Sequence, residues 1–373
     1  MSSITVMTVF GTRPEAIKMA PLIKELEKHE RIHSVVCVTA QHREMLDQVL
    51  EIFNIEPDYD LNIMKKGQSL TEITARVLEG LDGVIKKVKP DIVLVHGDTT
   101  TTFAAGLAAF YNQTKVGHVE AGLRTFDKYF PYPEEINRKL TGAIADLHFA
   151  PTVRNKQNLI RENINEKDIY ITGNTVIDAL ETTVKKECVF EDAVLKKLPY
   201  EQGKVVLVTA HRRENLGEPL ENICRALKAI AKKYADVHIV YPVHLNPVVR
   251  ETVSGILAGM DRVYLIDPLH VQELHNLMNR CYMVLTDSGG LQEEAPSLGK
   301  PVLVLRNETE RSEAVEAGTV KVAGVSEACI FKMACELIED ASMYDKMAKA
   351  VNPYGDGKAS KHIVQVILDK LAR

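Results

Sequence analysis

Short apolar runs alternate with longer amphipathic segments along almost all of this 373-residue chain. Most of the short runs are apolar throughout, which is typical of parallel strands that helices cover on both faces. The longer segments, such as 70–88 and 218–234, carry apolar residues at helical spacing. Repeated strand–helix–strand units of this kind predict an α/β protein with doubly wound parallel sheets and right-handed crossovers.

The series of strands occurs twice, and a polar, irregular stretch at 185–203 separates the two series. We therefore predict two Rossmann-like domains that face one another across a cleft, the first spanning 1–173 and the second 174–357. A final helix within 358–373 is predicted to pack back on the first domain. The expected strands are 4–11, 34–40, 91–97, 115–120, 147–150 and 168–172 in the first domain, and 204–210, 237–243, 262–267, 283–286, 301–305 and 319–322 in the second.

The composition limits the classes of partner. The net charge is −5 and no Lys/Arg-rich run is present, which argues against nucleic acid or a membrane surface as a partner. Six scattered cysteines without a C-x-x-C pair predict buried thiols in a reducing compartment and no metal site. The first ten residues lack a basic leader, and no apolar run reaches membrane-spanning length, so we expect a cytoplasmic protein.

The first expected strand ends in the motif G-T-R-P-E at 11–15. Ligands of open α/β sheets bind beyond the carboxyl ends of the strands, where helix N-termini present free N–H groups. Gly11 permits a sharp turn there, and Arg13 and Lys18 are placed to bind an anion, although a solvated cation is the alternative. The motif is not the G-x-G-x-x-G fingerprint, which argues against NAD.

Acidic residues follow three further elements of the first domain. Asp98 lies in H-G-D-T-T-T-T after one strand, and Glu120 ends the next in V-E-A-G-L-R-T. Glu134 or Glu135 opens a helix after a proline-rich loop. Each carboxylate alone could cap a helix or join a structural ion-pair network. Three acids at one sheet edge favour general acid/base chemistry, because neighbouring carboxylates shift one another's pKa values.

Basic residues follow the first strand of the second domain. His211 lies in T-A-H-R-R-E-N beside two arginines, which favours a phosphate contact or a proton carrier over a structural histidine. His244 occupies the corresponding place after the next strand, and its role stays open at this point.

The sequence D-S-G-G-L-Q-E-E at 287–294 predicts a diphosphate site. Ser288, Gly289 and Gly290 form a small turn into a helix whose N–H groups are suited to a diphosphate. Glu294 lies one turn further along, where its carboxylate could accept both hydroxyls of a ribose. Arg311 supplies a further cation near the next strand end. Together these residues predict a nucleotide diphosphate ligand.

These motifs, in this order and over essentially the whole chain, resemble the non-hydrolysing UDP-N-acetylglucosamine 2-epimerase family of bacteria. The resemblance implies a GT-B-like fold, UDP binding mainly by the second domain, no cofactor and a homodimer. It places the catalytic groups on Asp98, Glu120, Glu134 and His211, and the substrate contacts on Arg13, Lys18, Ser288, Gly289, Gly290, Glu294 and Arg311.

The resemblance also implies a second pocket, in which some members of the family bind another substrate molecule as an activator. Glu44 and Gly67 depart from the pattern, since close relatives carry Gln and Arg at these positions. The residues that match this allosteric pocket are Gln41, Arg212, His244 and Glu134, and Glu44 is a further possible position of the pocket despite its departure from the pattern.

The implied activity is reversible C2 epimerisation of UDP-N-acetylglucosamine to UDP-N-acetylmannosamine for cell-surface polysaccharide synthesis. The expected route eliminates UDP to give 2-acetamidoglucal and then re-adds it, which requires neither NAD nor a metal. A GT-B glycosyltransferase that uses UDP-N-acetylglucosamine, a hydrolysing 2-epimerase and a catalytically silent nucleotide-sugar sensor are the alternatives.

Overall fold

A computed structural model describes residues 3–40, 43–65 and 67–371. The chain forms two compact units, Met1–Thr182 with Tyr354–Arg373, and Thr183–Pro353. The first unit therefore includes most of helix α7 (Thr175–Thr183), which the sequence assigned to the second domain. The reason is a contact between distant segments, because the Asp178 carboxylate accepts the backbone N–H groups of Ala359 and Ser360 at 3.1 and 2.7 Å.

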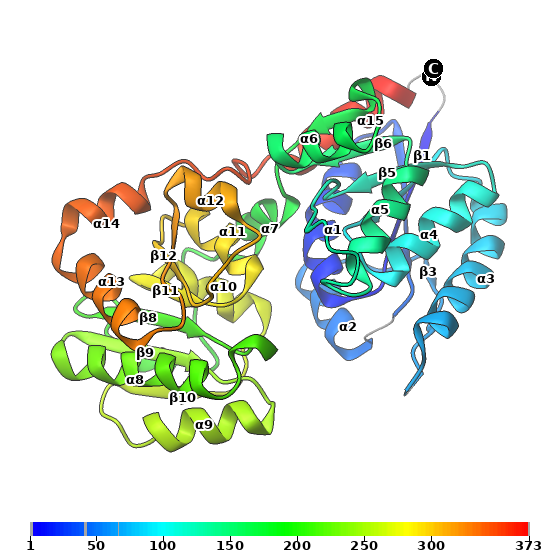
Figure 1. Cartoon of the computed structure of the whole chain (residues 1–373). Coiled ribbons are helices and arrows are strands. Elements are labelled where there is room, and N and C mark those ends of the chain that lie inside the picture. The colour runs from blue at the N-terminus through cyan, green and yellow to red at the C-terminus, as the bar shows by residue number, and fades with distance from the viewer. Residues whose placement is uncertain (1–2, 41–42, 66, 372–373) are drawn as a thin grey trace. The chain divides into compact units, whose positions relative to one another are not determined.

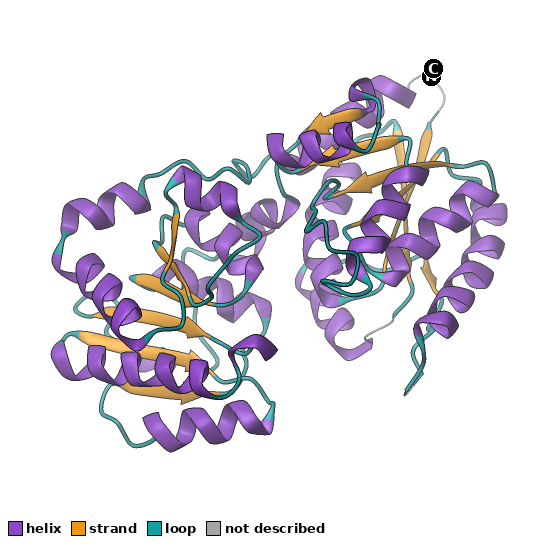
Figure 2. Ribbon diagram, viewed as in Figure 1, coloured by secondary structure: helices purple, strands orange, loops and turns teal. Residues whose placement is uncertain are grey.

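The first unit contains a seven-stranded sheet in the order β3-β2-β1-β4-β5-β6-β7, and all of its strand pairs are parallel (Figure 2). Strand β3 was not predicted, because a strand of two residues is too short to show a periodic pattern. The strands are β1 (Ile4–Phe10), β2 (Ile32–Val38), β3 (Tyr59–Asp60), β4 (Ile92–His96), β5 (Lys115–Val119), β6 (Leu147–Ala150) and β7 (Ile169–Ile171).

The second unit contains a six-stranded parallel sheet in the order β10-β9-β8-β11-β12-β13. This order repeats that of the first six strands of the first sheet, β3 to β6, without a counterpart of β7, which confirms the prediction of two doubly wound α/β units. The strands are β8 (Lys204–Thr209), β9 (Val237–Pro242), β10 (Val263–Ile266), β11 (Met283–Thr286), β12 (Val302–Val304) and β13 (Val320–Val322).

Helices connect the strands (Figure 1), and several of the helices begin at a polar side-chain cap. Helix α3 (Leu70–Val88) starts where the Ser69 hydroxyl accepts the N–H of Glu72 at 3.2 Å and the Glu72 carboxylate accepts the N–H of Ser69 at 2.8 Å. In the described part of the chain, no helix has the length and apolarity needed to cross a membrane. The remaining helices are α1 (Arg13–Leu26), α2 (Arg43–Ile52), α3 (Leu70–Val88), α4 (Thr100–Tyr111), α5 (Glu134–Ile144), α6 (Val153–Arg161), α8 (Glu218–Lys233), α9 (Pro247–Leu257), α10 (Val271–Arg280), α11 (Gly289–Ser297), α12 (Ser312–Ala317), α13 (Glu327–Glu339), α14 (Ala341–Ala348) and α15 (Ala359–Leu371), with 3-10 turns at Glu166–Asp168, Leu195–Lys197 and Arg213–Asn215.

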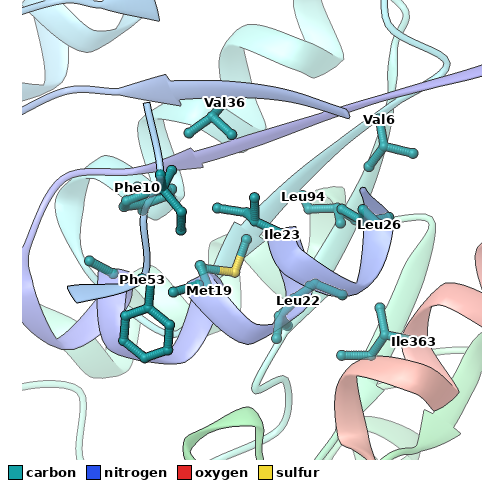
Figure 3. Packing of buried hydrophobic residues seen from close by; sticks show 14 of the residues in the cluster. Val6, Phe10, Met19, Leu22, Ile23, Leu26, Val36, Phe53, Leu94 and Ile363 are labelled. Carbon is teal, nitrogen blue, oxygen red and sulfur yellow. The ribbon is translucent and has the colours of Figure 1, made fainter. Parts of the chain in front are cut away.

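The C-terminal helix α15 contributes to the core of the first unit. Ile363 of α15 packs in one buried cluster with Ile23 and Leu26 of α1 and with Leu94 of β4 (Figure 3). All four side chains are inaccessible to solvent. Because burial of apolar surface is the main stabilising contribution to folding, the last helix is a structural part of this unit and no appendage.

The strand orders fix where ligands can bind. In each sheet the connections reverse direction at a switch point, between β1 and β4 in the first unit and between β8 and β11 in the second. Open α/β sheets bind ligands beyond the carboxyl ends of the strands at such points. The segments that follow these four strands are Gly11–Thr12, Gly97–Asp98, Ala210–His211 and Asp287–Ser288.

Replacing Gly122 by alanine is expected to lower the free energy of unfolding by about 3 kcal/mol. Gly122 has φ +91°, and a Cβ atom there would lie 2.3 Å from the carbonyl oxygen of Asn155. Gly67→Ala is the matched control, since Gly67 has φ +74° and no atom near the added Cβ. The control is expected to lose only about 1 kcal/mol in a urea titration of the same protein. Equal losses in the two variants would contradict the steric argument.

Candidate functional site

The turn between β1 and α1 is held by the buried carboxylate of Glu15. One oxygen accepts the N–H groups of Gly11 and Thr12 at 3.1 and 2.8 Å, and the other accepts the hydroxyls of Thr99 and Thr102 at 2.6 and 3.0 Å. Glu15 thereby joins the turn after β1 to the turn after β4, the two sides of the switch point.

Arg13 lies at the start of α1, directly after this turn. A Cβ atom on Gly11 would come within 2.0 Å of the Thr39 hydroxyl, so the turn requires glycine. The predicted anion-binding cation therefore stands at a helix N-terminus, which is a favourable place for a negative group.

Glu120 lies at the centre of the polar groups of the first unit. Its carboxylate forms an ion pair with Lys18, accepts the side-chain N–H of Asn174 at 2.9 Å and lies 3.5 Å from Nε2 of His96. Burial would raise the pKa of Glu120, but the charges of Lys18 and His96 outweigh it and hold the pKa well below its usual range. Glu120 is therefore ionised at neutral pH, which is the form of a carboxylate that can accept a proton.

The backbone of Glu120 adopts the left-handed conformation, with φ +61°. Residues with a side chain rarely adopt this conformation, and it occurs often at functional sites. The neighbouring Gly97 also has a positive φ of +68°, and a Cβ atom on it would lie 3.9 Å from Oε1 of Glu120. The turn after β4 thus lies against the carboxylate that follows β5.

Asp98 is held by residues of α5. Its carboxylate accepts the guanidinium N–H of Arg138 at 2.6 Å, and its carbonyl oxygen accepts the amide of Asn137 at 2.9 Å. One quarter of the Asp98 side chain stays exposed. Since Glu134 lies four residues before Arg138, both residues lie on the face of α5 that Asp98 contacts.

The two adjacent glutamates at the start of α5 differ in their surroundings. Glu135 is fully buried, and it accepts the N–H groups of Thr125 and Phe126 at 3.1 Å and pairs with Arg138 at 3.1 Å. Glu134 has a buried carboxylate oxygen, Oε2, without a hydrogen-bond partner among the residues that the structure describes. Glu135 therefore holds the preceding loop, whereas Glu134 keeps an oxygen for a ligand or a proton.

In the second unit, α11 begins at Ser288 without a side-chain cap. A Cβ atom on Gly289 would lie 3.3 Å from Cζ of Arg311, and one on Gly290 would lie 3.1 Å from Oε1 of Glu294. The two glycines therefore let a guanidinium and a carboxylate approach the start of the helix closely. The structure brings together all five residues that the sequence assigned to the diphosphate and ribose.

Glu294 is buried and oriented by a histidine. Its Oε2 lies 3.1 Å from Nε2 of His275, and Nδ1 of the same ring lies 2.7 Å from the hydroxyl of Thr183. His275 carries no local signal of this role, because it stands in the middle of an amphipathic helix with no strand end beside it.

Arg311 belongs to an ion-pair network that the sequence analysis also missed. It pairs with Glu293 at 2.8 Å and with Glu310 at 3.1 Å, and Glu310 pairs with Arg306 at 2.7 Å. Burial would raise the pKa of Glu310, but Arg311 and Arg306 lower it to about 2. Arg306 follows β12 closely, and this strand-end position is the signal that could have revealed it.

His211 follows β8 in a loop that Asp287 organises. The buried Oδ2 of Asp287 accepts the N–H groups of His211 and Arg212 at 2.7 and 2.8 Å and the amide of Asn215 at 3.0 Å. The ring of His211 stacks on the ring of His244, with 5.2 Å between the centroids. Burial lowers the pKa of His211, and Asp287 partly opposes this effect.

The residues matched to the second, allosteric pocket are only partly described. Gln41 and the side chain of Glu44 lie outside the described residues. Arg212 lies 3.7 Å from Glu310, and His244 stacks on His211, so both contact the groups around the diphosphate turn. Within the described ranges, no group of three or more His, Cys, Asp or Glu side chains is arranged to hold a metal ion.

Comparison with known proteins identifies relatives along the whole chain. The family model described as UDP-N-acetylglucosamine 2-epimerase matches residues 24–368. The UDP-N-acetylglucosamine 2-epimerase of Bacillus subtilis (strain 168) is 60% identical over 368 residues, which cover 99% of this chain and 96% of the relative.

Solved structures agree with this match. A crystal structure of a UDP-N-acetylglucosamine 2-epimerase has a TM-score of 0.92 at 56% identity and covers 100% of this chain and 98% of that one. The UDP-GlcNAc 2-epimerase from Neisseria meningitidis bound to UDP-GlcNAc has a TM-score of 0.88 at 54% identity, with 98% and 100% of the two chains covered. A glycotransferase of kitacinnamycin, 12% identical with a TM-score of 0.66, shares the fold alone, and the GT-B-like fold class is confirmed.

Proposed function

We propose that this chain, which belongs to the UDP-N-acetylglucosamine 2-epimerase family, interconverts UDP-N-acetylglucosamine and UDP-N-acetylmannosamine without releasing free sugar. The observation that carries this proposal is the Glu120 carboxylate after β5, ionised beside Lys18 and His96 and next to the turn after β4. A proton must leave and rejoin C2 of the sugar, and this carboxylate is suited to that task.

The proposed reaction begins by breaking the bond between C1 and the oxygen of the diphosphate. UDP leaves with the electron pair, a carboxylate takes the proton from C2, and a C1–C2 double bond forms in 2-acetamidoglucal. In the reverse sense, a proton is added to the opposite face of C2 and UDP attacks C1. The hydrogen on C2 becomes acidic only as the C1–O bond breaks, so stabilisation of the leaving diphosphate is as important as the base.

The proposal divides these tasks between the two units. Asp98, Glu120 and Glu134 supply the base and the acid, and Arg13 and Lys18 supply positive charge beside them. His211, the turn at Ser288, Gly289 and Gly290, and Arg311 stabilise the diphosphate, while Glu294 accepts the hydroxyls of the ribose. Support comes from the uncapped start of α11 and from the ionised state of Glu120 beside Lys18.

Further parts of the proposal follow from the family. The enzyme forms a homodimer, acts in cell-surface polysaccharide synthesis and uses no cofactor, because the proposed steps move only a proton and a leaving group. Arg212 and His244 contribute to a second substrate site beside the reacting one. These assignments rest on motif matches and on the contacts of the two side chains with Glu310 and His211.

Turnover in D₂O is expected to place deuterium at C2 of the product, because the proton removed by the carboxylate exchanges with solvent. Mass spectrometry of UDP-N-acetylmannosamine formed from unlabelled substrate measures this incorporation. Complete retention of the original hydrogen would exclude the proposed mechanism. Analysis of the same mixture tests the alternatives, since a hydrolysing enzyme accumulates free N-acetylmannosamine and UDP, and a transferase leaves the substrate unchanged.

A further inference from the structure

Asp287 is the most buried charged group beside the proposed diphosphate turn. Its side chain has no exposed surface, and its oxygen Oδ2 accepts three N–H groups from the loop after β8. The other oxygen, Oδ1, is also buried and has no hydrogen-bond partner among the described residues. A buried acceptor without a donor is energetically unfavourable, so a donor is expected within reach of Oδ1.

A candidate donor beside Oδ1 is the ring of His211. Its Nδ1 atom lies 3.5 Å from Oδ1 of Asp287, slightly beyond hydrogen-bond distance, so a small rotation of the ring completes the contact. The backbone N–H of the same histidine already donates to Oδ2 at 2.7 Å. One carboxylate thus binds the main chain of His211 and lies beside its ring.

We propose that Asp287 is a positioning residue for His211, which keeps the proton of the neutral ring on Nδ1 and leaves Nε2 as the nitrogen available to the diphosphate. The consequence for catalysis rests on the proposed function of His211. The contact between Asp287 and His211 does not depend on that function. A carboxylate that accepts from Nδ1 also stabilises the imidazolium form, in which Nε2 donates to an anion.

The other charged groups around the His211 ring disfavour its protonation, whereas Asp287 favours it. His244 stacks on the ring and Arg212 follows it in the loop, and a positive charge on either disfavours the imidazolium. Asp287 is the negative group that faces the ring, and Tyr241, whose hydroxyl donates to the carbonyl oxygen of Ala210 at 2.6 Å, stays neutral. Asp287 therefore keeps the ring able to take up a proton when an anionic diphosphate arrives.

His244 offers an internal contrast. Its Nδ1 accepts the N–H of Asn246 at 3.1 Å, so the proton of its neutral ring is on Nε2. The two stacked histidines should therefore carry opposite tautomers, and ¹⁵N-histidine NMR of the unmodified protein distinguishes them. The signals are assigned by their loss in His211→Gln and His244→Gln.

Asp287→Asn is expected to reverse the tautomer of His211. An asparagine oxygen in the place of Oδ2 still accepts the backbone N–H groups, but the amide nitrogen in the place of Oδ1 is a donor and drives the proton to Nε2. The pKa of His211 should fall in the variant, because the negative charge that opposes burial is removed. In pH profiles with UDP-N-acetylglucosamine, kcat/KM should fall by about 10²-fold, and the limb assigned to His211 should move to lower pH.

Asp178→Asn is the matched control, since Asp178 is also a buried aspartate that accepts two backbone N–H groups, in the other unit. It should change neither the tautomer of His211 nor the pH profile. If Asp287→Asn does not fold, the tautomer in the unmodified protein still decides the proposal. A wild-type His211 that is protonated on Nε2 would overturn it, and so would an unchanged tautomer and pH profile in folded Asp287→Asn. If the unmodified protein has no epimerase activity, the proposed function fails, while the NMR result still tests Asp287.

Discussion

Glu120→Gln is expected to lower kcat for epimerisation of UDP-N-acetylglucosamine by about 10²- to 10⁴-fold, which is the usual contribution of a positioned general acid or base. An amide cannot take a proton from C2, although it has nearly the same shape and can still accept the N–H of Asn174. Binding of UDP should be nearly unchanged, because the diphosphate contacts are proposed for the other unit. Initial rates and isothermal titration with UDP measure the two quantities.

Glu25→Gln is a closely matched control for this variant. The Glu25 side chain is 12% exposed, compared with 11% for Glu120, and it also contacts a lysine and a histidine, Lys28 at 2.8 Å and His29 at 3.7 Å. It lies near the end of α1 opposite to Arg13, far along the helix from the carboxyl edge of the sheet. The kcat of Glu25→Gln should equal that of the unmodified enzyme. Near-normal turnover by Glu120→Gln would show that Glu120 is structural.

Asp98→Asn extends the same prediction to the second acid. Its loss of kcat should be of similar size if Asp98 takes part in proton transfer, since the variant keeps an oxygen for Arg138. A loss in only one of the two variants would assign the proton transfer to the acid that is affected. Deuterium incorporation by each variant would then report which face of C2 it serves.

Glu294→Gln is expected to raise the Kd for UDP by about 30-fold, since a charge-assisted hydrogen bond contributes roughly 2 kcal/mol. The buried carboxylate of Glu294 is fixed by His275, and its other oxygen faces the first turn of α11 next to Gly290. Two ribose hydroxyls can donate to a carboxylate, whereas an amide offers one acceptor and places a donor against the second hydroxyl. Isothermal titration with UDP measures the change.

Glu273→Gln separates loss of binding from loss of structure. Glu273 is as buried as Glu294 and also contacts a histidine, His270 at 3.6 Å, but its carboxylate accepts backbone N–H groups of Glu191 and Asp192. This control should lower the melting temperature without changing the Kd for UDP. If Glu294→Gln binds UDP as tightly as the control does, the ribose assignment is wrong. Comparison with UMP, which lacks the second phosphate, would localise any effect that is found.

Much of the fold was predictable because its signals are local. Continuous apolar runs identified the strands longer than two residues, and helical spacing identified α3 at its observed bounds, since both patterns follow from backbone geometry. The same reasoning located the candidate site. In a parallel sheet the carboxyl ends of all strands meet at one edge, so Asp98, Glu120 and the turn at Ser288–Gly290 could be assigned to ligand-binding edges from their positions alone.

The remaining features depend on contacts between residues distant in the chain. Nothing local distinguishes Glu134 from Glu135. Only packing decides that Glu135 is buried against Arg138, while one Glu134 oxygen has no partner in the described part of the chain. Asp287 reaches the loop after β8 across 76 residues of sequence. Side-chain pairing of this kind has no periodic signature.

By itself, therefore, the sequence determined two doubly wound units and the strand ends at which their ligands are expected, because these follow from periodicity and strand order. Only the tertiary structure decided which charged groups pair. It assigned α7 to the first unit through Asp178, and it revealed the positions of His275, Arg306, Glu310 and Asp287 around the predicted residues. The physical reason is that the pKa and orientation of a buried charge are set by its spatial neighbours, and folding chooses these neighbours from anywhere in the chain.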